Sequence, residues 1–119
     1  VALAKIKNYT EAIQAVCHDW RNTICFVADD QDMNLHLNQA ESLVAIVDTA
    51  YPELNINKIY ADAYFREKTS GGYRYPDAHE AIKEQVDGGA LIVNYTGHGG
   101  LTGWAEEHIL DMPSIRSFD

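Results

Sequence analysis

His98 lies in a loop made largely of glycine, and this segment of the sequence is the one best suited to chemistry. Gly97, Gly99 and Gly100 surround the imidazole, and glycines leave backbone N–H groups open to a ligand. His98 could then act as a general base, while the N–H of Gly99 lies near a developing oxyanion. The pattern predicts acyl-transfer chemistry, and the alternative is a simple glycine turn that carries a surface histidine.

Two adjacent acids, Asp29 and Asp30, follow an apolar run and are the candidate partners of this histidine. A carboxylate that accepts the second ring N–H would fix the tautomer of the imidazole. We assign this role to Asp30. The nucleophile that such chemistry needs is missing from both loops.

The apolar patterns predict an α/β fold that brings these loops together. Strands are predicted over 23–28, 56–60 and 90–94, and amphipathic helices over 36–51 and 76–88. Short, continuously apolar strands that alternate with helices indicate a parallel sheet in βαβαβ order, flanked by helices and with right-handed crossovers. Ligands of such sheets gather at the carboxyl ends of the strands. Both the acids and the histidine loop emerge there.

Proline and glycine residues support the predicted ends of these helices. Pro52 stops the second helix, Pro76 suits the first turn of the third, and Gly88-Gly89 close it. A first helix is predicted to begin at Thr10, with apolar positions at Ile13, Val16, Cys17 and Trp20, and a short helix is predicted over 104–110.

Composition narrows the classes of function. The 119 residues hold 18 Asp and Glu against 9 Lys and Arg, a net charge of −9. This charge argues against nucleic acid and anionic membranes as partners. The apolar runs are far shorter than the roughly 18 residues of a membrane span, so we expect no transmembrane segment, and no signal peptide is visible. The chain opens with Val1 and stops at Asp119, which suggests a piece of a longer protein.

The two cysteines do not define a disulfide framework. Cys17 falls on the apolar face of the first predicted helix and Cys25 inside the first predicted strand. Both are interpreted as small hydrophobic residues of the core.

The segment Ala90-Leu91-Ile92-Val93-Asn94-Tyr95-Thr96-Gly97-His98-Gly99-Gly100, followed by Trp104-Ala105, resembles the catalytic-histidine segment of the gingipain family of cysteine peptidases. Its Asn-Tyr-Thr-Gly-His-Gly core is the specific part. Upstream, Phe26-Val27-Ala28-Asp29-Asp30 resembles the family's strand that ends at an acidic triad partner, and the likeness extends from about Trp20 to Leu110. The family is similar to caspases in fold.

This resemblance implies roles for particular residues. His98 would be the catalytic histidine, Gly99 would lend its N–H to the oxyanion hole, and Asp30 would orient His98, with Asp29 as the fallback. The family's nucleophilic cysteine follows the histidine motif at the end of the next strand, and this chain has no cysteine after Cys25. We therefore expect residues 1–119 to be part of a single, truncated peptidase domain that continues beyond both ends and is inactive alone.

The resemblance also bears on substrate and location. Arginine-specific members place an acid near the start of the helix after the first strand, where this chain has His36. That difference favours the branch that works as the sortase-like peptidase of type IX secretion, which removes C-terminal sorting domains. The partner would be a protein or peptide substrate at the outer-membrane surface or outside the cell, and no cofactor is implied.

Calcium and zinc binding are two competing hypotheses. An EF-hand-like spacing places oxygen donors at relative positions 1, 3, 5, 9 and 12 and a histidine at 7, but position 6 lacks the required glycine and a strand precedes the loop. A calcium site of another kind in this acidic loop is the variant we retain. A weak zinc hypothesis lacks the short ligand spacings typical of such sites. The residues concerned are Asp30, Asp32, Asn34, His36, Asn38 and Glu41 for calcium, and His98, His108 and Asp111 with His36 for zinc.

Two further classes remain as alternatives. A phosphoacceptor receiver domain also has paired acids after its first strand, but the third strand here ends in Asn94-Tyr95-Thr96 without an acceptor aspartate. A non-catalytic binding domain of the same fold is the other. A cysteine at the end of the next apolar strand of the parent protein would separate the peptidase from the binding domain.

Overall fold

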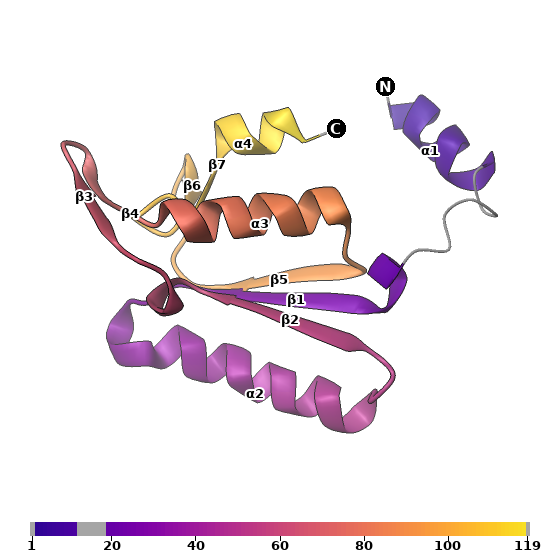
Figure 1. The fold of residues 1–119 in the computed structure, drawn as a ribbon, viewed down its shortest axis with the longest axis horizontal. Coiled ribbons are helices and arrows are strands. Elements are labelled where there is room, and N and C mark those ends of the chain that lie inside the picture. The colour runs from indigo at the N-terminus through magenta and orange to yellow at the C-terminus, as the bar shows by residue number, and fades with distance from the viewer. Residues whose placement is uncertain (1, 12–18, 119) are drawn as a thin grey trace.

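The computed structural model describes residues 2–11 and 19–118, which form a three-layer α/β arrangement (Figure 1). Its parallel strands and principal helices follow the predicted βαβαβ order. The elements are α1 (Ala2–Glu11), η1 (Asp19–Asn22), β1 (Thr23–Ala28), η2 (Asp32–Asn34), α2 (Leu35–Ala50), β2 (Asn55–Tyr60), η3 (Ala61–Ala63), β3 (Glu67–Thr69), β4 (Gly72–Arg74), α3 (Pro76–Gly88), β5 (Ile92–Thr96), β6 (Gly103–Trp104), β7 (Leu110–Asp111) and α4 (Met112–Ser117).

The central sheet has three parallel strands in the order β2-β1-β5. β1 lies in the middle, and all six of its residues are buried. In the register of the sheet, Ala28 at the end of β1 pairs with Tyr60 of β2 on one side and Thr96 of β5 on the other. The prediction of a parallel α/β sheet flanked by helices is therefore confirmed.

Alternate side chains of β1 supply the core on the two faces of the sheet. Ile24 and Phe26 pack with Val44 of α2 on one face. Cys25 and Val27 belong to the larger cluster on the other face, which includes Ile82 of α3. Figure 1 shows the same layering, with α2 on one side of the sheet and α3 on the other. A strand covered on both faces is mainly apolar, and for this reason β1, which is apolar from Ile24 to Ala28, was recognisable from its sequence.

The end of α3 agrees with the prediction. The helix ends at Gly88, and Gly89 is its C-cap with φ of +90°. A Cβ at position 89 would lie 2.8 Å from the Cβ of Trp20, so both the backbone conformation and the close approach of Trp20 require glycine there.

Three local predictions were wrong. Thr10 lies inside α1 and does not begin a helix, and the predicted positions Ile13, Val16 and Cys17 lie outside the described residues. β5 runs over Ile92–Thr96 and not 90–94, because pairing with β1 sets its end opposite Ala28. The predicted helix over 104–110 is replaced by turns between the short antiparallel strands β6 and β7.

The long connection after β2 contains a hairpin that the sequence analysis treated as a loop. β3 and β4 pair antiparallel, with Thr69 opposite Gly72. Gly72 has φ of +110°, and the Ser70-Gly71 pair between the strands is a turn signal.

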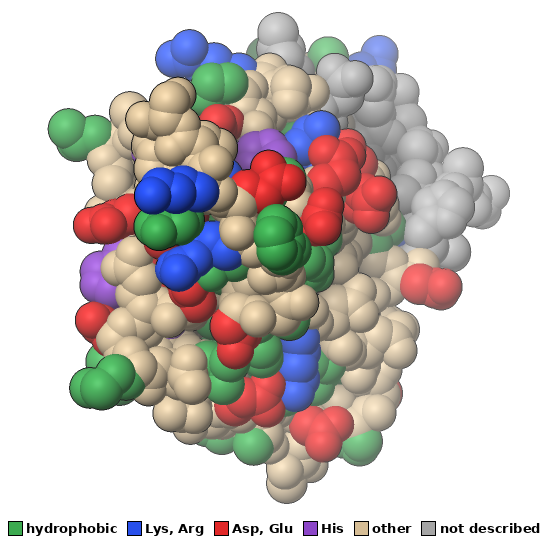
Figure 2. All heavy atoms as spheres, turned by 60° about the vertical axis from the view of Figure 1, so that its left-hand side comes forward, with side chains coloured by type: hydrophobic (Ala, Val, Ile, Leu, Met, Phe, Trp, Pro, Cys, Tyr) green, Lys and Arg blue, Asp and Glu red, His purple; other side chains and the backbone are tan. Residues whose placement is uncertain are grey.

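The described surface carries many acidic side chains. Figure 2 shows Asp and Glu side chains over much of one face, with Lys and Arg side chains interspersed among them. Among the residues that the structure describes, no helix combines the length and the apolar character needed to cross a membrane.

Candidate active site

The register of the sheet brings the histidine loop to the first acid after β1. Ala28 pairs with Thr96, so Asp29 and Gly97 are the first residues beyond the paired ends of β1 and β5. The backbone N–H of Asp29 donates to the Thr96 carbonyl oxygen over 3.4 Å. His98 therefore emerges directly beside Asp29 at the carboxyl edge of the sheet, where chemistry was expected.

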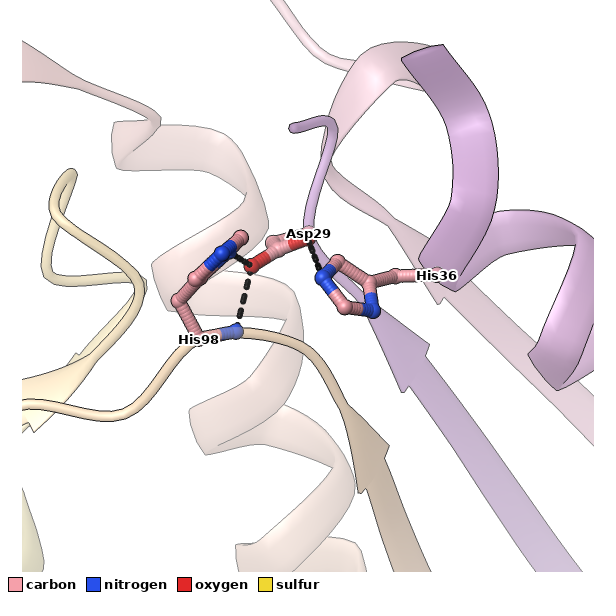
Figure 3. A group of neighbouring side chains, drawn as sticks. All are labelled: Asp29, His36 and His98. Atoms are coloured by element: carbon pink, nitrogen blue, oxygen red, sulfur yellow. Dashed lines mark hydrogen bonds and ion pairs between the residues drawn. The ribbon is translucent and has the colours of Figure 1, made fainter. Parts of the chain in front are cut away.

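Asp29 is bonded to His98 through both the backbone and the ring (Figure 3). The His98 N–H donates to Asp29 Oδ2 over 2.6 Å, and Nδ1 of the ring lies 3.0 Å from the same oxygen. The Asp29 side chain is completely buried, whereas that of His98 is 41% exposed. The hydrogen bond to this carboxylate raises the pKa of His98 above its ordinary value, since it favours the charged ring.

The acid that meets the Nδ1 of His98 is not the one that the sequence analysis chose. Asp30 turns away from His98: its Oδ2 accepts a hydrogen bond of 2.5 Å from the Tyr75 hydroxyl and lies 3.8 Å from a guanidinium nitrogen of Arg66. Asp29, which the sequence analysis kept as the fallback, is the carboxylate that contacts the N–H and the Nδ1 of His98. The missing information was the register of β5, because the strand ends two residues later than predicted.

Gly97 is required for this contact. A Cβ at this position would collide with the Tyr95 hydroxyl and lie 2.7 Å from Asp29 Oδ2. Only a residue without a side chain lets the chain pass this close to the buried carboxylate. The glycine before the histidine thus has a steric reason that is independent of any catalytic role.

The His98 loop is held in place from its other side. The His98 carbonyl oxygen accepts hydrogen bonds of 2.7 Å from both the Tyr95 hydroxyl and the Ala105 N–H. The Tyr95 ring stacks on Trp104, with ring centroids 4.4 Å apart and planes 2° from parallel. The loop that carries the histidine is therefore anchored by side-chain, backbone and ring contacts.

Gly99 keeps its N–H out of the local backbone pairing. Gly99 and Trp104 form an isolated antiparallel bridge. Its hydrogen bonds run from Ala105 N–H to the His98 oxygen and from Gly100 N–H to the Gly103 oxygen, which is the pattern that leaves the bridged residues unbonded to each other. A cavity of about 310 Å³ lies beside this loop, with His98, Gly99, Glu106 and His108 among its lining residues.

His36 is a third member of the site, and the zinc hypothesis had placed it within reach of His98. The residues Asp32, Met33 and Asn34 have φ of +57°, +53° and +65°, a run of left-handed backbone that is unusual outside glycine. This turn brings the start of α2 back to the sheet edge. There the His36 ring meets the His98 ring edge to face, with centroids 4.8 Å apart.

The predicted calcium set is not assembled, and of the predicted zinc set only His36 and His98 come together. Asn38 and Glu41 lie within α2, and Glu41 accepts hydrogen bonds from Lys58 and Tyr60, whose donors lower its pKa. Asp111 caps α4 by accepting from the Ser114 N–H. Among the residues described, the metal-compatible group is a different one, formed by Asp29, His36 and His98.

Cys25 is not placed for chemistry. It is a free, fully buried cysteine in β1, and burial raises the pKa of its thiol to about 11. A buried thiol with a raised pKa is a poor source of thiolate. Cys17 lies outside the described residues.

Comparison with known proteins identifies one family. The sequence model of peptidase family C25 matches residues 1–119, the whole chain. No curated protein and no solved structure matches this chain.

Proposed function

Since this chain belongs to peptidase family C25, the gingipain family of cysteine peptidases, we propose that His98 and Asp29 are the base and the orienting carboxylate of peptide-bond cleavage. The observation that carries the proposal is the double contact of Asp29 Oδ2 with the N–H and the ring Nδ1 of His98. It fixes both the loop and the ring of the histidine with one buried carboxylate.

The contact selects the tautomer that catalysis needs. With its proton on Nδ1, the His98 ring donates to Asp29, and Nε2 keeps its lone pair. Nε2 then takes the proton of a cysteine thiol, and the sulfur attacks the carbonyl carbon of the scissile peptide bond. As the C–N bond breaks, the imidazolium returns that proton to the leaving amine, and water later hydrolyses the thioester.

Gly99 is the proposed donor to the oxyanion. Its N–H is outside the bridge with Trp104, next to the cavity that His98 lines. No atom beyond its chain neighbours lies within 4 Å of the position that a Gly99 Cβ would take, which gives a substrate carbonyl room to approach. A fixed donor at this place stabilises the charge that develops in the transition state.

The thiol comes, in this proposal, from a segment of the parent protein outside residues 1–119. Cys25 is unsuited because it is buried and its pKa is raised. Thiolate and imidazole act as a unit, so residues 1–119 alone should not cleave peptides.

Peptide cleavage by the full-length protein tests the proposal. His98→Ala should lower turnover by several orders of magnitude, because it removes the proposed base that takes the thiol proton. His79→Ala is the matched control, since His79 bonds Ser114 away from the site, and it should keep wild-type turnover. Circular dichroism checks that both variants fold. A folded His98→Ala variant with wild-type turnover would refute the assignment, and a parent with no cleavage would favour a binding domain.

The substrate class is a second step of the proposal. The first turn of α2 holds no acid, and His36 stands where the arginine-specific members have one. We therefore propose a sortase-like peptidase of type IX secretion, which acts on C-terminal sorting domains at the outer-membrane surface or outside the cell. A secreted substrate with its sorting domain should be cut at the domain junction. Preferred cleavage of small arginine peptides would contradict this step.

A further inference from the structure

Asp29, His36 and His98 bring one carboxylate and two imidazoles together, with ligand atoms that all lie within 4.8 Å of one another (Figure 3). We propose that these three residues bind a divalent transition-metal ion, for which Zn²⁺ is the test ion, and that the bound ion switches the site off. The proposed metal binding does not depend on the peptidase assignment. The proposed inhibition does, because it rests on the proposed function of His98.

Two buried atoms at the centre of the group have no hydrogen-bond partner among the described residues. They are Asp29 Oδ1 and His36 Nε2. The Asp29 side chain is completely buried, and the two atoms face each other at 3.8 Å, beyond the reach of a hydrogen bond. Buried polar atoms are nearly always satisfied, so this pair indicates a bridging group.

The distances suit a metal ion. Zn²⁺ bonds to imidazole nitrogen and carboxylate oxygen are about 2.0–2.2 Å long, so two ligands of one ion lie at most about 4.4 Å apart. The 3.8 Å between Asp29 Oδ1 and His36 Nε2 and the 3.0 Å between His98 Nδ1 and Asp29 Oδ2 are within that limit. The widest separation in the group, at most 4.8 Å, closes with a small rotation of a side chain.

The donor set selects the class of ion. Two imidazoles and one carboxylate favour zinc and its transition-metal neighbours, whereas Ca²⁺ and Mg²⁺ prefer shells of oxygen. Asp32 adds a further carboxylate: its Oδ2 lies 3.6 Å from His36 Nε2 and 3.3 Å from His98 Nε2. The left-handed turn that contains Asp32 therefore holds a further carboxylate oxygen beside both rings.

A metal ion at this place would stop catalysis for a simple reason. An ion bound to His98 Nδ1 would keep the ring proton on Nε2, so Nε2 would have no lone pair with which to take the thiol proton. An ion on Asp29 would also draw the carboxylate from its contact with His98. Removal of the ion by a chelator would restore both. The site would thus keep the peptidase inactive while transition metal is available.

Zn²⁺ binding to the full-length protein, measured by isothermal titration calorimetry at neutral pH, tests the site without relying on activity. His36→Gln should weaken binding roughly 100-fold or more, since the loss of an outer-shell partner alone weakens metal sites by about 10–100-fold. His79→Gln is the matched control, because His79 lies outside the group, and it should bind as wild type. The absorption spectrum of added Co²⁺ should show nitrogen and oxygen ligation.

Each result decides the proposal. Equal Zn²⁺ affinity in wild type and His36→Gln would overturn the site, as would a sulfur-to-cobalt charge-transfer band that His36→Gln leaves unchanged. Zn²⁺ should also inhibit peptide cleavage by wild type, with recovery on adding a chelator. If the protein binds Zn²⁺ through His36 but cleaves no peptide, the peptidase assignment fails and the metal site stands.

Discussion

At the scale of single residues, Asp29 connects every part of the site. One of its oxygens contacts the N–H and ring of His98, and the other faces His36. Its side chain is completely buried, and its hydrogen bond to the ring is the main cause of the raised pKa of His98. The pKa of His98 should therefore change when Asp29 is substituted.

We predict that Asp29→Asn lowers the pKa of His98, because the hydrogen bond to Asp29 is the main cause of its raised value. Asp30→Asn should leave the pKa of His98 near that of wild type, since Asp30 bonds Tyr75 instead. Titration of the His98 ring by NMR in the full-length protein measures both. A larger shift from Asp30→Asn would contradict the geometry.

The same shift has a consequence for stability. A histidine whose pKa is raised on folding stabilises the fold fully below its unfolded pKa of roughly 6.5, and this contribution is lost as the pH rises through the folded value. The difference in the free energy of unfolding between wild type and Asp29→Asn should therefore decrease as the pH rises from the unfolded pKa of the histidine through its raised folded pKa. Urea unfolding at several pH values tests the sign.

Gly97→Ala should disrupt the pair without touching either member. The added Cβ would meet Asp29 Oδ2 and the Tyr95 hydroxyl, so the His98 loop must move away from the carboxylate. We expect a lower pKa of His98 and a loss of peptide cleavage. Gly88→Ala is the control, because nothing lies within 4 Å of its Cβ position. Wild-type cleavage by Gly97→Ala would show that the close approach is not needed.

At the scale of elements, α3 stabilises the face of the sheet on which Tyr75 and Tyr95 also pack. Ile82 is 1% exposed there. Ile82→Ala should lower the free energy of unfolding by about 2–5 kcal/mol, the range for large-to-small substitutions in cores. Ile46→Ala on the exposed side of α2 should change it by about 0.5 kcal/mol or less. Chemical denaturation measures both, and equal effects would contradict the assigned core.

The principal elements could be predicted from the sequence because each carries a strong local signal. β1 is apolar from Ile24 to Ala28 since it is covered on both faces, and α3 has Pro76 at its start and Gly89 beyond its end. The end of β5 could not be predicted, because it depends on pairing with Ala28 across the sheet. The same pairing of β5 with β1 determines that Asp29, and not Asp30, contacts the N–H and the Nδ1 of His98.

Local sequence patterns also could not predict the turns between β5 and α4 or the position of His36. β6 and β7 have two residues each, too few for a periodic pattern. His36 reaches the site only through three successive left-handed residues, Asp32 to Asn34. Asn and Asp tolerate that conformation, but nothing in their spacing says that three such residues will follow one another.

At the scale of the whole molecule, the two edges of the sheet differ. Within the described residues, β2 and β5 each pair only with β1. β2 carries Lys58, and a lysine on an edge strand discourages pairing with other chains. β5 has no charged residue, and Ile92 is 51% exposed. The β5 edge is therefore the one available to a further strand.

We predict that residues 1–119 alone self-associate through the β5 edge. Ile92→Lys should reduce this association, because a charge at the edge opposes strand addition. Ile46→Lys places the same charge on an isoleucine that is 64% exposed on α2, and it should not reduce association. Sedimentation velocity over a concentration series measures the effect. A monomeric wild-type chain at high concentration would rule out an associating edge.

Peptide cleavage by the full-length protein carrying Asp29→Asn or Asp30→Asn is the most direct test of the central claim, that Asp29 orients His98 as the base of a cysteine peptidase. The two substitutions remove one charge from adjacent residues, and only Asp29 contacts His98. Asp29→Asn should lower kcat by at least roughly 100-fold, because the ring loses the acceptor that fixes its tautomer. Asp30→Asn should stay within a few-fold of wild type. Loss of activity in Asp30→Asn with retention in Asp29→Asn would contradict the account.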